Sequence, residues 1–234
     1  MFDLLTNVIE DTTPFYSYES IECIRTELLQ SKKTINRSDY GTGALKGKSR
    51  KQKVKHIAKN AAKSAKYGQL LFRLVNHFQP ATILELGTSL GISTLYLATP
   101  NKKSKVLTLE GCPETAAIAK QNFEKENLKN IELVIGNFDA TLPEILKAIE
   151  TIDCVFFDGN HQQEPTLSYF EQCLLHINEN TLFIFDDIHW SDEMEEAWTS
   201  IKNYPQVTLS IDLFFVGLVF FRKQRAQEHF VIRF

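Results

Sequence analysis

The sequence predicts an α/β fold with one mostly parallel sheet and helices on both of its faces. Two observations lead to this prediction: short apolar runs alternate with helical segments, and the chain closes with two apolar runs that nearly touch in sequence. The predicted strands are 82–86, 106–110, 131–135, 152–157 and 181–186, and the predicted helices lie near 92–99, 114–127, 140–149, 165–177 and 192–203. The last two runs, 207–213 and 216–222, are too close for a crossover helix, so we expect an antiparallel hairpin at the sheet edge. The sheet would then be seven-stranded.

A helical extension is expected before the sheet. Residues 18–32 place apolar side chains at helical spacing, whereas residues 31–49 lose this periodicity, which predicts a helix followed by a mobile basic loop. Apolar residues then return every three or four positions over 50–78 and predict one long amphipathic helix. We therefore divide the chain into an N-terminal extension, residues 1–66, and a ligand-binding domain, residues 67–234.

The composition is that of an ordinary globular protein, with 234 residues, of which 43% are hydrophobic and 24% charged. No apolar run reaches the roughly 18 residues of a membrane-spanning helix, and the first ten residues lack the basic start of a signal peptide. The cysteines form no C-x-x-C pair, so their spacing indicates neither a zinc site nor a disulfide framework; they are Cys23, Cys112, Cys154 and Cys173. We expect a reduced, cytoplasmic protein without a membrane segment.

Positive charge is concentrated in one segment. Residues 32–66 hold twelve Lys and Arg residues and one acid, although the net charge of the whole chain is −3. Such a segment is commonly a solvated face or a tail, but it can also recruit an anionic substrate or a nucleic acid. The composition leaves these alternatives open.

The strongest functional signal is a glycine-hinged turn after the first predicted strand. The apolar run 83–86 leads into Gly87 and Gly91, and glycine lets a backbone turn sharply and approach a ligand where a Cβ would clash. The next strand ends at Glu110, and a carboxylate roughly 20 residues past such a turn is placed to accept hydrogen bonds from two ribose hydroxyls. The spacing E-x-G-x-x-x-G differs from the G-x-G-x-x-G of dinucleotide sites, so a nucleoside without a pyrophosphate fits better.

With these residues, the chain resembles the class I S-adenosylmethionine-dependent methyltransferases over roughly residues 70–222. Their first motif is similar to the stretch from Glu85 to Gly91, and their second ends in an acid like Glu110. The resemblance implies a Rossmann-like sheet and places Asn137 and Phe138 against the adenine ring. The residues expected to contact S-adenosylmethionine are Glu85, Gly87, Thr88, Gly91, Ser93, Thr94, Glu110, Gly111, Asn137, Phe138 and Asp158.

Polar residues follow the fourth predicted strand at the edge where open α/β sheets bind ligands. Asp158 can hold the methionine amino group or a metal ion, and its ordinary alternative is a turn aspartate. His161 titrates near neutrality and can remove a proton from an acceptor hydroxyl or amine. A plain loop histidine is the alternative at this position.

The fifth predicted strand delivers Asp186, Asp187 and His189 to the same edge. Adjacent carboxylates beside Asp158 repel one another unless a cation or a proton relieves them, which suggests Mg²⁺ or Mn²⁺. The arrangement resembles the catechol-type O-methyltransferases and a related bacterial branch, and this resemblance implies Asp158, Asp186 and Asp187 as metal ligands. His161 stands where those enzymes carry a lysine, and Asp187 where they carry an asparagine. In this interpretation His189 shares the catalytic work with His161.

We expect methyl transfer from S-adenosylmethionine to a small polar acceptor, preferably at oxygen, with an anionic acceptor as one option. The loop 39–43 would close over the pocket. Trp190, Met194 and Trp198 stand at four-residue spacing, which normally marks a buried helix face, and lining of the acceptor site, by Trp190 above all, is the alternative. The basic face 46–66 supports an alternative, a nucleic-acid methyltransferase, but the Asn/Asp-Pro-Pro-aromatic motif of base-amine enzymes is absent. A protein that binds the nucleoside without methylating an acceptor is a second alternative, and a homodimer is left open.

Overall fold

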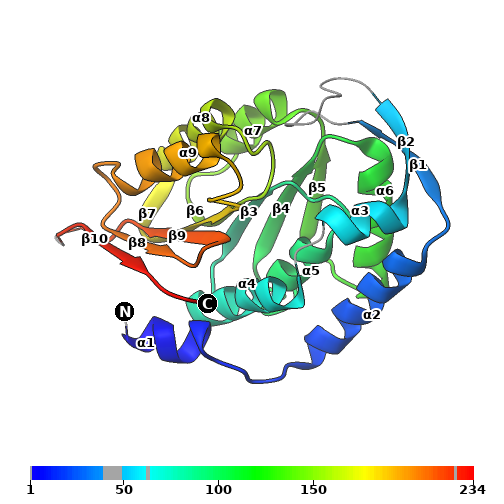
Figure 1. Ribbon diagram of the computed structural model, residues 1–234, viewed down its shortest axis with the longest axis horizontal. Coiled ribbons are helices and arrows are strands. Elements are labelled where there is room, and N and C mark those ends of the chain that lie inside the picture. Colours follow the sequence, from blue (N-terminus) through cyan, green and yellow to red (C-terminus); the bar gives the residue numbers. More distant parts are fainter. Residues whose placement is uncertain (1, 39–48, 62–63, 224–225) are drawn as a thin grey trace.

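The computed structural model describes residues 2–38, 49–61, 64–223 and 226–234. Its main sheet has eight strands: β3 (Thr82–Leu86), β4 (Lys105–Glu110), β5 (Ile131–Ile135), β6 (Ile152–Phe157), β7 (Ile177–Asp186), β8 (Leu209–Asp212), β9 (Val216–Phe220) and β10 (Glu228–Val231). The strands lie in the order β10-β8-β9-β7-β6-β3-β4-β5 (Figure 1). The five strands from β3 to β7 are parallel, whereas β9 pairs antiparallel with both β7 and β8.

Helices cover both faces of this sheet (Figure 1). They are α1 (Phe2–Leu4), η1 (Leu5–Ile9), α2 (Tyr16–Gln30), α3 (Val54–Ala61), α4 (Ala65–Phe78), α5 (Ile92–Ala98), α6 (Pro113–Lys125), α7 (Phe138–Lys147), α8 (Gln163–Leu174) and α9 (Asp192–Lys202). One hydrophobic cluster joins the sheet to η1 and α2 to α6, and a second joins it to α7, α8 and α9. Within the described part of the chain, no helix has both the length and the apolar character needed to span a membrane.

The central strands are apolar because they are buried on both faces. Along β3, Ile83 belongs to the first cluster and Leu84 and Leu86 belong to the second, and all three side chains are inaccessible to solvent. A strand covered on both sides needs apolar residues at successive positions, which explains the nearly continuous apolar run in the sequence.

The order of the strands creates a binding position at the end of β3. This strand has β4 on one side and β6 on the other, so the chain winds outward in both directions from it. In open α/β sheets, ligands bind beyond the carboxyl ends of the strands at such a switch point. Glu110 ends β4, Asp158 follows β6 and Asp186 ends β7, so all three acids lie at this edge.

The predicted fold class is confirmed, including the antiparallel pair near the C-terminus, but the predicted count of seven strands is wrong. The eighth strand, β10, pairs in parallel with β8 through the register Glu228↔Leu209. All four of its residues are exposed, so no apolar alternation marks it in the sequence.

The structure also corrects the N-terminal prediction. The segment predicted as a mobile loop contains β1 (Thr34–Ser38), which pairs antiparallel with β2 (Ser49–Lys53). The long helix predicted over 50–78 is instead β2 followed by α3 and α4, and Ser64 has an extended backbone just before α4. The predicted closing loop 39–43 and residues 44–48 lie outside the described residues. The division of the chain after residue 66 stays a prediction.

Candidate active site

The turn after β3, which we call the glycine turn (Gly87–Gly91), needs its glycines for steric reasons. Gly87 has φ +114°, and a Cβ on it would stand 2.1 Å from the backbone oxygen of Asp158. Gly91 has φ +85°, and its Cβ would stand 2.6 Å from the ring of Phe123 on α6. Left-handed backbone favours glycine, and these contacts leave no room for a side chain. The predicted sharp turn is therefore present, and the approach of its backbone to a ligand stays a prediction.

Glu110 lies beside the glycine turn with both carboxylate oxygens oriented by the backbone. One oxygen accepts the N–H of Ser89 at 2.8 Å and the other accepts the N–H of Cys112 at 2.8 Å. The side chain is partly exposed, and Gly111 follows it at the sheet edge. Each carboxylate oxygen has a second lone pair, so Glu110 can still accept a hydrogen bond from a ligand hydroxyl. This geometry fits the predicted ribose contact.

Glu85 occupies a different environment, buried beneath the glycine turn. Its carboxylate accepts the hydroxyls of Thr94 at 2.5 Å and Thr108 at 2.6 Å, and Ser93 also lies beside it. Complete burial raises the pKa of Glu85, because the charged form loses its hydration. Thr88 is buried as well, with its hydroxyl 2.5 Å from that of Thr108. Contacts of these residues with a cofactor stay predictions.

The residues predicted to face adenine lie at the start of α7. The side-chain oxygen of Asn137 accepts the N–H of Asp139, so Asn137 is the N-cap of that helix. The ring of Phe138 packs against Gly159 in the loop after β6, where a Cβ would stand 2.7 Å from the ring. Both residues therefore follow β5, and Phe138 reaches the loop after β6, while their contact with adenine stays a prediction.

Three predicted site residues converge at the ends of β6 and β7. The ligand atoms of Asp158, His161 and Asp186 all lie within 4.8 Å of one another, and we call this group the acid–histidine cluster. His161 Nε2 lies 3.7 Å from Asp158 Oδ1 and 4.0 Å from Asp187 Oδ2. Asp187 has φ +54°, a strained backbone for a residue other than glycine. Carboxylate oxygens and an imidazole suit Mn²⁺, and the carboxylates alone suit Mg²⁺.

Residues 84–188 match the family model described as "Methyltransferase domain". This span begins in β3 and ends just after β7, so it contains the glycine turn, Glu110 and the acid–histidine cluster. Over this central span, residues 84–188 of 234, the chain is similar to the methyltransferase family.

Individual relatives agree with this similarity. The chain is 30% identical to catechol O-methyltransferase of Niastella koreensis over 53% of its own length and 57% of that protein, so it spans about half the length of such curated relatives. Its fold is similar to that of cofactor-bound Rv0187 from MTB, with a TM-score of 0.66, 20% identity and 95% coverage of both chains. It is also similar to the O-methyltransferase from Bacillus cereus in complex with SAH, with a TM-score of 0.63, 21% identity and coverage of 94% and 95%.

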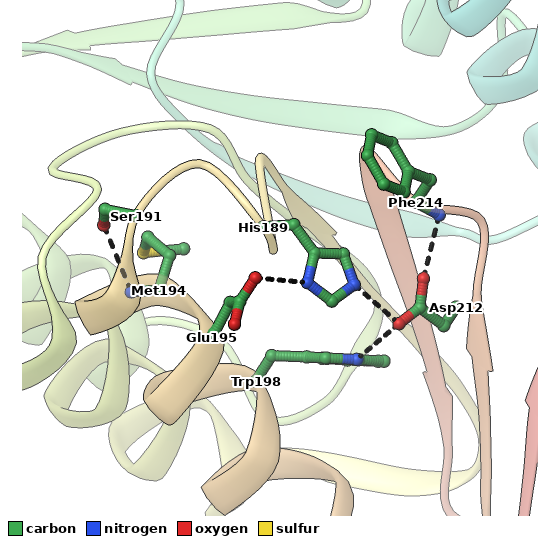
Figure 2. Close-up of polar contacts among 7 residues, drawn as sticks. All are labelled: His189, Ser191, Met194, Glu195, Trp198, Asp212 and Phe214. Carbon is green, nitrogen blue, oxygen red and sulfur yellow. Dashed lines mark hydrogen bonds and ion pairs between the residues drawn. The ribbon is translucent and has the colours of Figure 1, made fainter.

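His189 lies outside the acid–histidine cluster, although a catalytic role was predicted for it from the sequence. Figure 2 shows its ring between two carboxylates, with Nδ1 3.2 Å from Glu195 and Nε2 2.8 Å from Asp212. Trp198 donates its indole N–H to the same Asp212 at 3.2 Å. His189 therefore connects the loop after β7 to α9 and β8, and its catalytic role stays a prediction.

The sequence analysis missed Asp212 and Phe214 in this region. Asp212 falls inside a predicted strand, where an isolated acid carries no functional signal, and its partners Trp198 and His189 are distant in sequence. Phe214 lies outside the predicted strands. Its side chain is exposed, and its backbone has a left-handed conformation with φ +73°. Only the three-dimensional structure brings these two residues together with His189.

Proposed function

We propose that the protein transfers the methyl group of S-adenosylmethionine to an oxygen atom of a small polar acceptor. The observation that carries this proposal is the position of Glu110, whose carboxylate is oriented by two backbone N–H groups beside the glycine turn. The acid–histidine cluster lies at the same edge of the sheet, on the far side of that turn. Donor binding and acceptor activation can thus take place next to each other.

Each part of the cofactor would meet a different group of the chain. Glu110 would accept the ribose hydroxyls, and the backbone at Gly87 would pass close to the ligand because no Cβ intervenes. Asn137 and Phe138 would lie against adenine. Asp158, held by its backbone N–H to the carbonyl of Leu86 at 2.9 Å, would receive the methionine amino group.

When bound, S-adenosylmethionine supplies an electrophilic methyl carbon on a positively charged sulfur. Transfer is an in-line displacement in which the acceptor oxygen–carbon bond forms while the sulfur–carbon bond breaks. The acceptor hydroxyl would release a proton, and His161 would accept it. Asp158 and Asp187, at 3.7 and 4.0 Å from His161 Nε2, would stabilise the imidazolium that results.

A divalent cation would fit the carboxylates at this edge. Asp158 and Asp186 would hold Mg²⁺ or Mn²⁺, and either Asp187 or His161 would supply a further ligand. Such a cation would lower the pKa of a bound hydroxyl and orient the acceptor. If His161 ligates the metal, it cannot also accept the proton, so the two roles of His161 are alternatives. For Asp158 as well, holding the metal and receiving the methionine amino group are alternatives.

The basic hairpin β1–β2 supports an anionic acceptor. Glu114 at the start of α6 accepts both the backbone N–H and the side-chain amide of Asn36 at 2.9 Å, which fixes β1 close to Glu110. Arg50 and Lys51 are exposed on the neighbouring strand β2. These cations would attract a carboxylate or phosphate group toward the site. Lys46 and Lys48 belong to the same basic segment 32–66 and lie outside the described residues.

The experiment is a methyl-transfer assay with S-adenosylmethionine and two acceptors, catechol and 3,4-dihydroxybenzoate, followed by release of S-adenosylhomocysteine. We expect turnover of a hydroxylated acceptor, and we expect Arg50→Ala with Lys51→Ala to raise KM for the anionic acceptor alone. Turnover of an RNA or DNA substrate instead, with a steep dependence on salt, would favour the nucleic-acid alternative. Cofactor binding without transfer to any acceptor would favour a binding protein. The cytoplasmic location and the homodimer stay predictions.

A further inference from the structure

A cavity of about 170 Å³ lies where α1, the end of α4 and the strands β8, β9 and β10 meet (Figure 1). It is distant from the candidate active site. Phe220, at one end of β9, lines the cavity, whereas Val216, at the other end, is the register partner of Asp186 in the acid–histidine cluster. Four residues of strand, about 13 Å, separate these two positions. The cavity therefore lies at the opposite edge of the sheet from the glycine turn.

The floor of this cavity is apolar. The rings of Phe78 and Phe220 lie with their centroids 5.7 Å apart, and Leu4 and Leu209 line the same space. Phe220 and Leu4 are buried, so these side chains form a packed surface rather than a loose fringe. An apolar cavity of about 150 Å³ in a protein is large enough to take up benzene. The floor thus has room for one small ring or branched alkyl group.

One wall of the cavity is fixed by Asp3 on α1. Its Oδ1 accepts the side-chain amide of Asn7 at 2.6 Å, and its Oδ2 lies 3.2 Å from Nε2 of His77 on α4. Asn7 belongs to η1, a π-helix, and short segments of this rare helix occur frequently at functional sites. Both oxygens of Asp3 thus hold the wall together, and the recognition of a ligand falls to the other charged groups of the cavity.

The rim of the cavity carries a cation and an anion. Arg222 follows β9 and Glu228 begins β10, and both residues are exposed. A guanidinium presents a planar set of donors that matches a carboxylate, and a glutamate carboxylate accepts hydrogen bonds from an ammonium group. A ligand that carries both charges next to an apolar body therefore matches the rim and the floor together.

We infer that this cavity is a second ligand site, which binds a free amino acid with an apolar side chain. Arg222 receives the carboxylate, Glu228 receives the ammonium group, and the side chain packs on Phe78 and Phe220. An apolar acid would offer nothing to Glu228 and an apolar amine nothing to Arg222, so the zwitterion is the better electrostatic complement of the rim. The inference does not depend on the proposed methyl transfer.

The test titrates L-phenylalanine into isotope-labelled protein and follows the backbone amide signals by nuclear magnetic resonance. Excess S-adenosylhomocysteine is present throughout, because it carries an amino-acid group of its own and fills the proposed cofactor position. Two analogues separate the charges: hydrocinnamate lacks the ammonium group and phenethylamine lacks the carboxylate. Arg222→Gln and Glu228→Gln remove the rim charges one at a time. Arg233→Gln and Glu196→Gln are the matched controls, because both residues are exposed and neither lines the cavity.

We expect L-phenylalanine to shift the signals of Phe78, Leu209 and Glu228 and to bind more tightly than either analogue. Arg222→Gln should weaken the binding of L-phenylalanine and hydrocinnamate about two- to fivefold, as for an exposed charge pair, and leave that of phenethylamine unchanged. Glu228→Gln should weaken the binding of L-phenylalanine and phenethylamine by a similar factor and leave that of hydrocinnamate unchanged. Both control variants should bind all three ligands like the wild type.

Three results would overturn the inference. Signal shifts confined to the glycine turn and the acid–histidine cluster would place the amino acid in the candidate active site instead. Absence of shifts with both L-phenylalanine and L-leucine would show that the cavity does not bind this class of ligand. Equal weakening of all three ligands in Arg222→Gln and in Glu228→Gln would indicate a merely structural role of these residues. Each result can be obtained whether or not the protein transfers a methyl group.

Discussion

The backbone carbonyl of Asp158 faces Gly87 so closely that a Cβ on the glycine would stand 2.1 Å from its oxygen. The backbone N–H of Asp158 also donates to the carbonyl of Leu86 at 2.9 Å. These contacts fasten the loop after β6 to the glycine turn after β3. The proposed donor and acceptor positions are thus parts of one packed unit, and a disturbance at Gly87 should reach both.

Gly87→Ala is therefore expected to lower the affinity for the cofactor as well as the free energy of unfolding. The methyl group enters a contact that only backbone movement can relieve, and φ +114° is unfavourable for alanine. We expect the free energy of unfolding to fall by about 1–3 kcal/mol and the affinity for S-adenosylhomocysteine to fall at least tenfold. Chemical denaturation and calorimetry measure the two effects. Gly217→Ala is the control, because its Cβ would meet only the ring of Trp198 and should lower stability without loss of cofactor.

Glu85→Gln should change the pH dependence of stability. Burial raises the pKa of Glu85 in the folded chain above 4.5, so over the range upward from pH 4.5 the folded protein holds a proton that the unfolded chain has released. The wild type therefore loses stability as pH rises through this window, and glutamine has no such proton to lose. The difference in unfolding free energy, variant minus wild type, should increase from pH 4.5 upward. A difference that is constant with pH would contradict this account of Glu85.

Removal of one acid from the acid–histidine cluster should weaken the binding of a divalent cation. Asp186 is 1% exposed and lies with Asp158 and His161 inside the 4.8 Å group, so Asp186→Asn removes a central charge. We expect the wild type to bind Mn²⁺ and the variant to bind it about tenfold or more weakly, measured by electron paramagnetic resonance. Asp192→Asn, an exposed acid on α9, is the control. Equal Mn²⁺ affinity in the wild type and Asp186→Asn would contradict the proposal that the cluster binds a metal ion.

Substitution of His161 and substitution of His189 should change different kinetic parameters. His161 faces Asp158 and Asp187, whereas both ring nitrogens of His189 face Glu195 and Asp212. His161→Asn should lower kcat by about 10²- to 10⁴-fold with little change in cofactor affinity. His189→Asn should raise acceptor KM more than it lowers kcat, because it loosens the contact to Asp212. Steady-state rates with catechol distinguish them, and equal kcat losses in both variants would speak against His161 as the proton acceptor.

The sequence was sufficient for the sheet because β3, β4, β6 and the second half of β7 are largely buried on both faces, and these strands and the edge strand β5 appear as apolar runs. It was not sufficient for β1 and β2, whose polar sequences TINRS and SRKQK form a ladder only by pairing with each other across the intervening residues. The break between α3 and α4 was also hidden, because apolar spacing continues through it. Backbone pairing between distant segments leaves little trace in a local pattern.

A similar distinction applies to the site. Glu110 and Asp158 were predictable because they end strands whose order places them at one edge. The role of His189 was not, because it depends on Asp212, 23 residues further along the chain. Likewise, the environment of Glu85 emerged only once Thr108 on the neighbouring strand was in place. Motifs locate the edge where ligands bind, and contacts between elements decide what each side chain does there.

Binding of S-adenosylhomocysteine, measured by calorimetry on the wild type and on Glu110→Ala, tests the central claim most directly. Glu132→Ala on the neighbouring strand β5 removes an exposed carboxylate and serves as the control. We predict micromolar binding by the wild type and by the control, and loss of binding in Glu110→Ala, because the ribose hydroxyls would lose their acceptor. Absence of binding by the wild type, or unchanged binding by Glu110→Ala, would contradict the account.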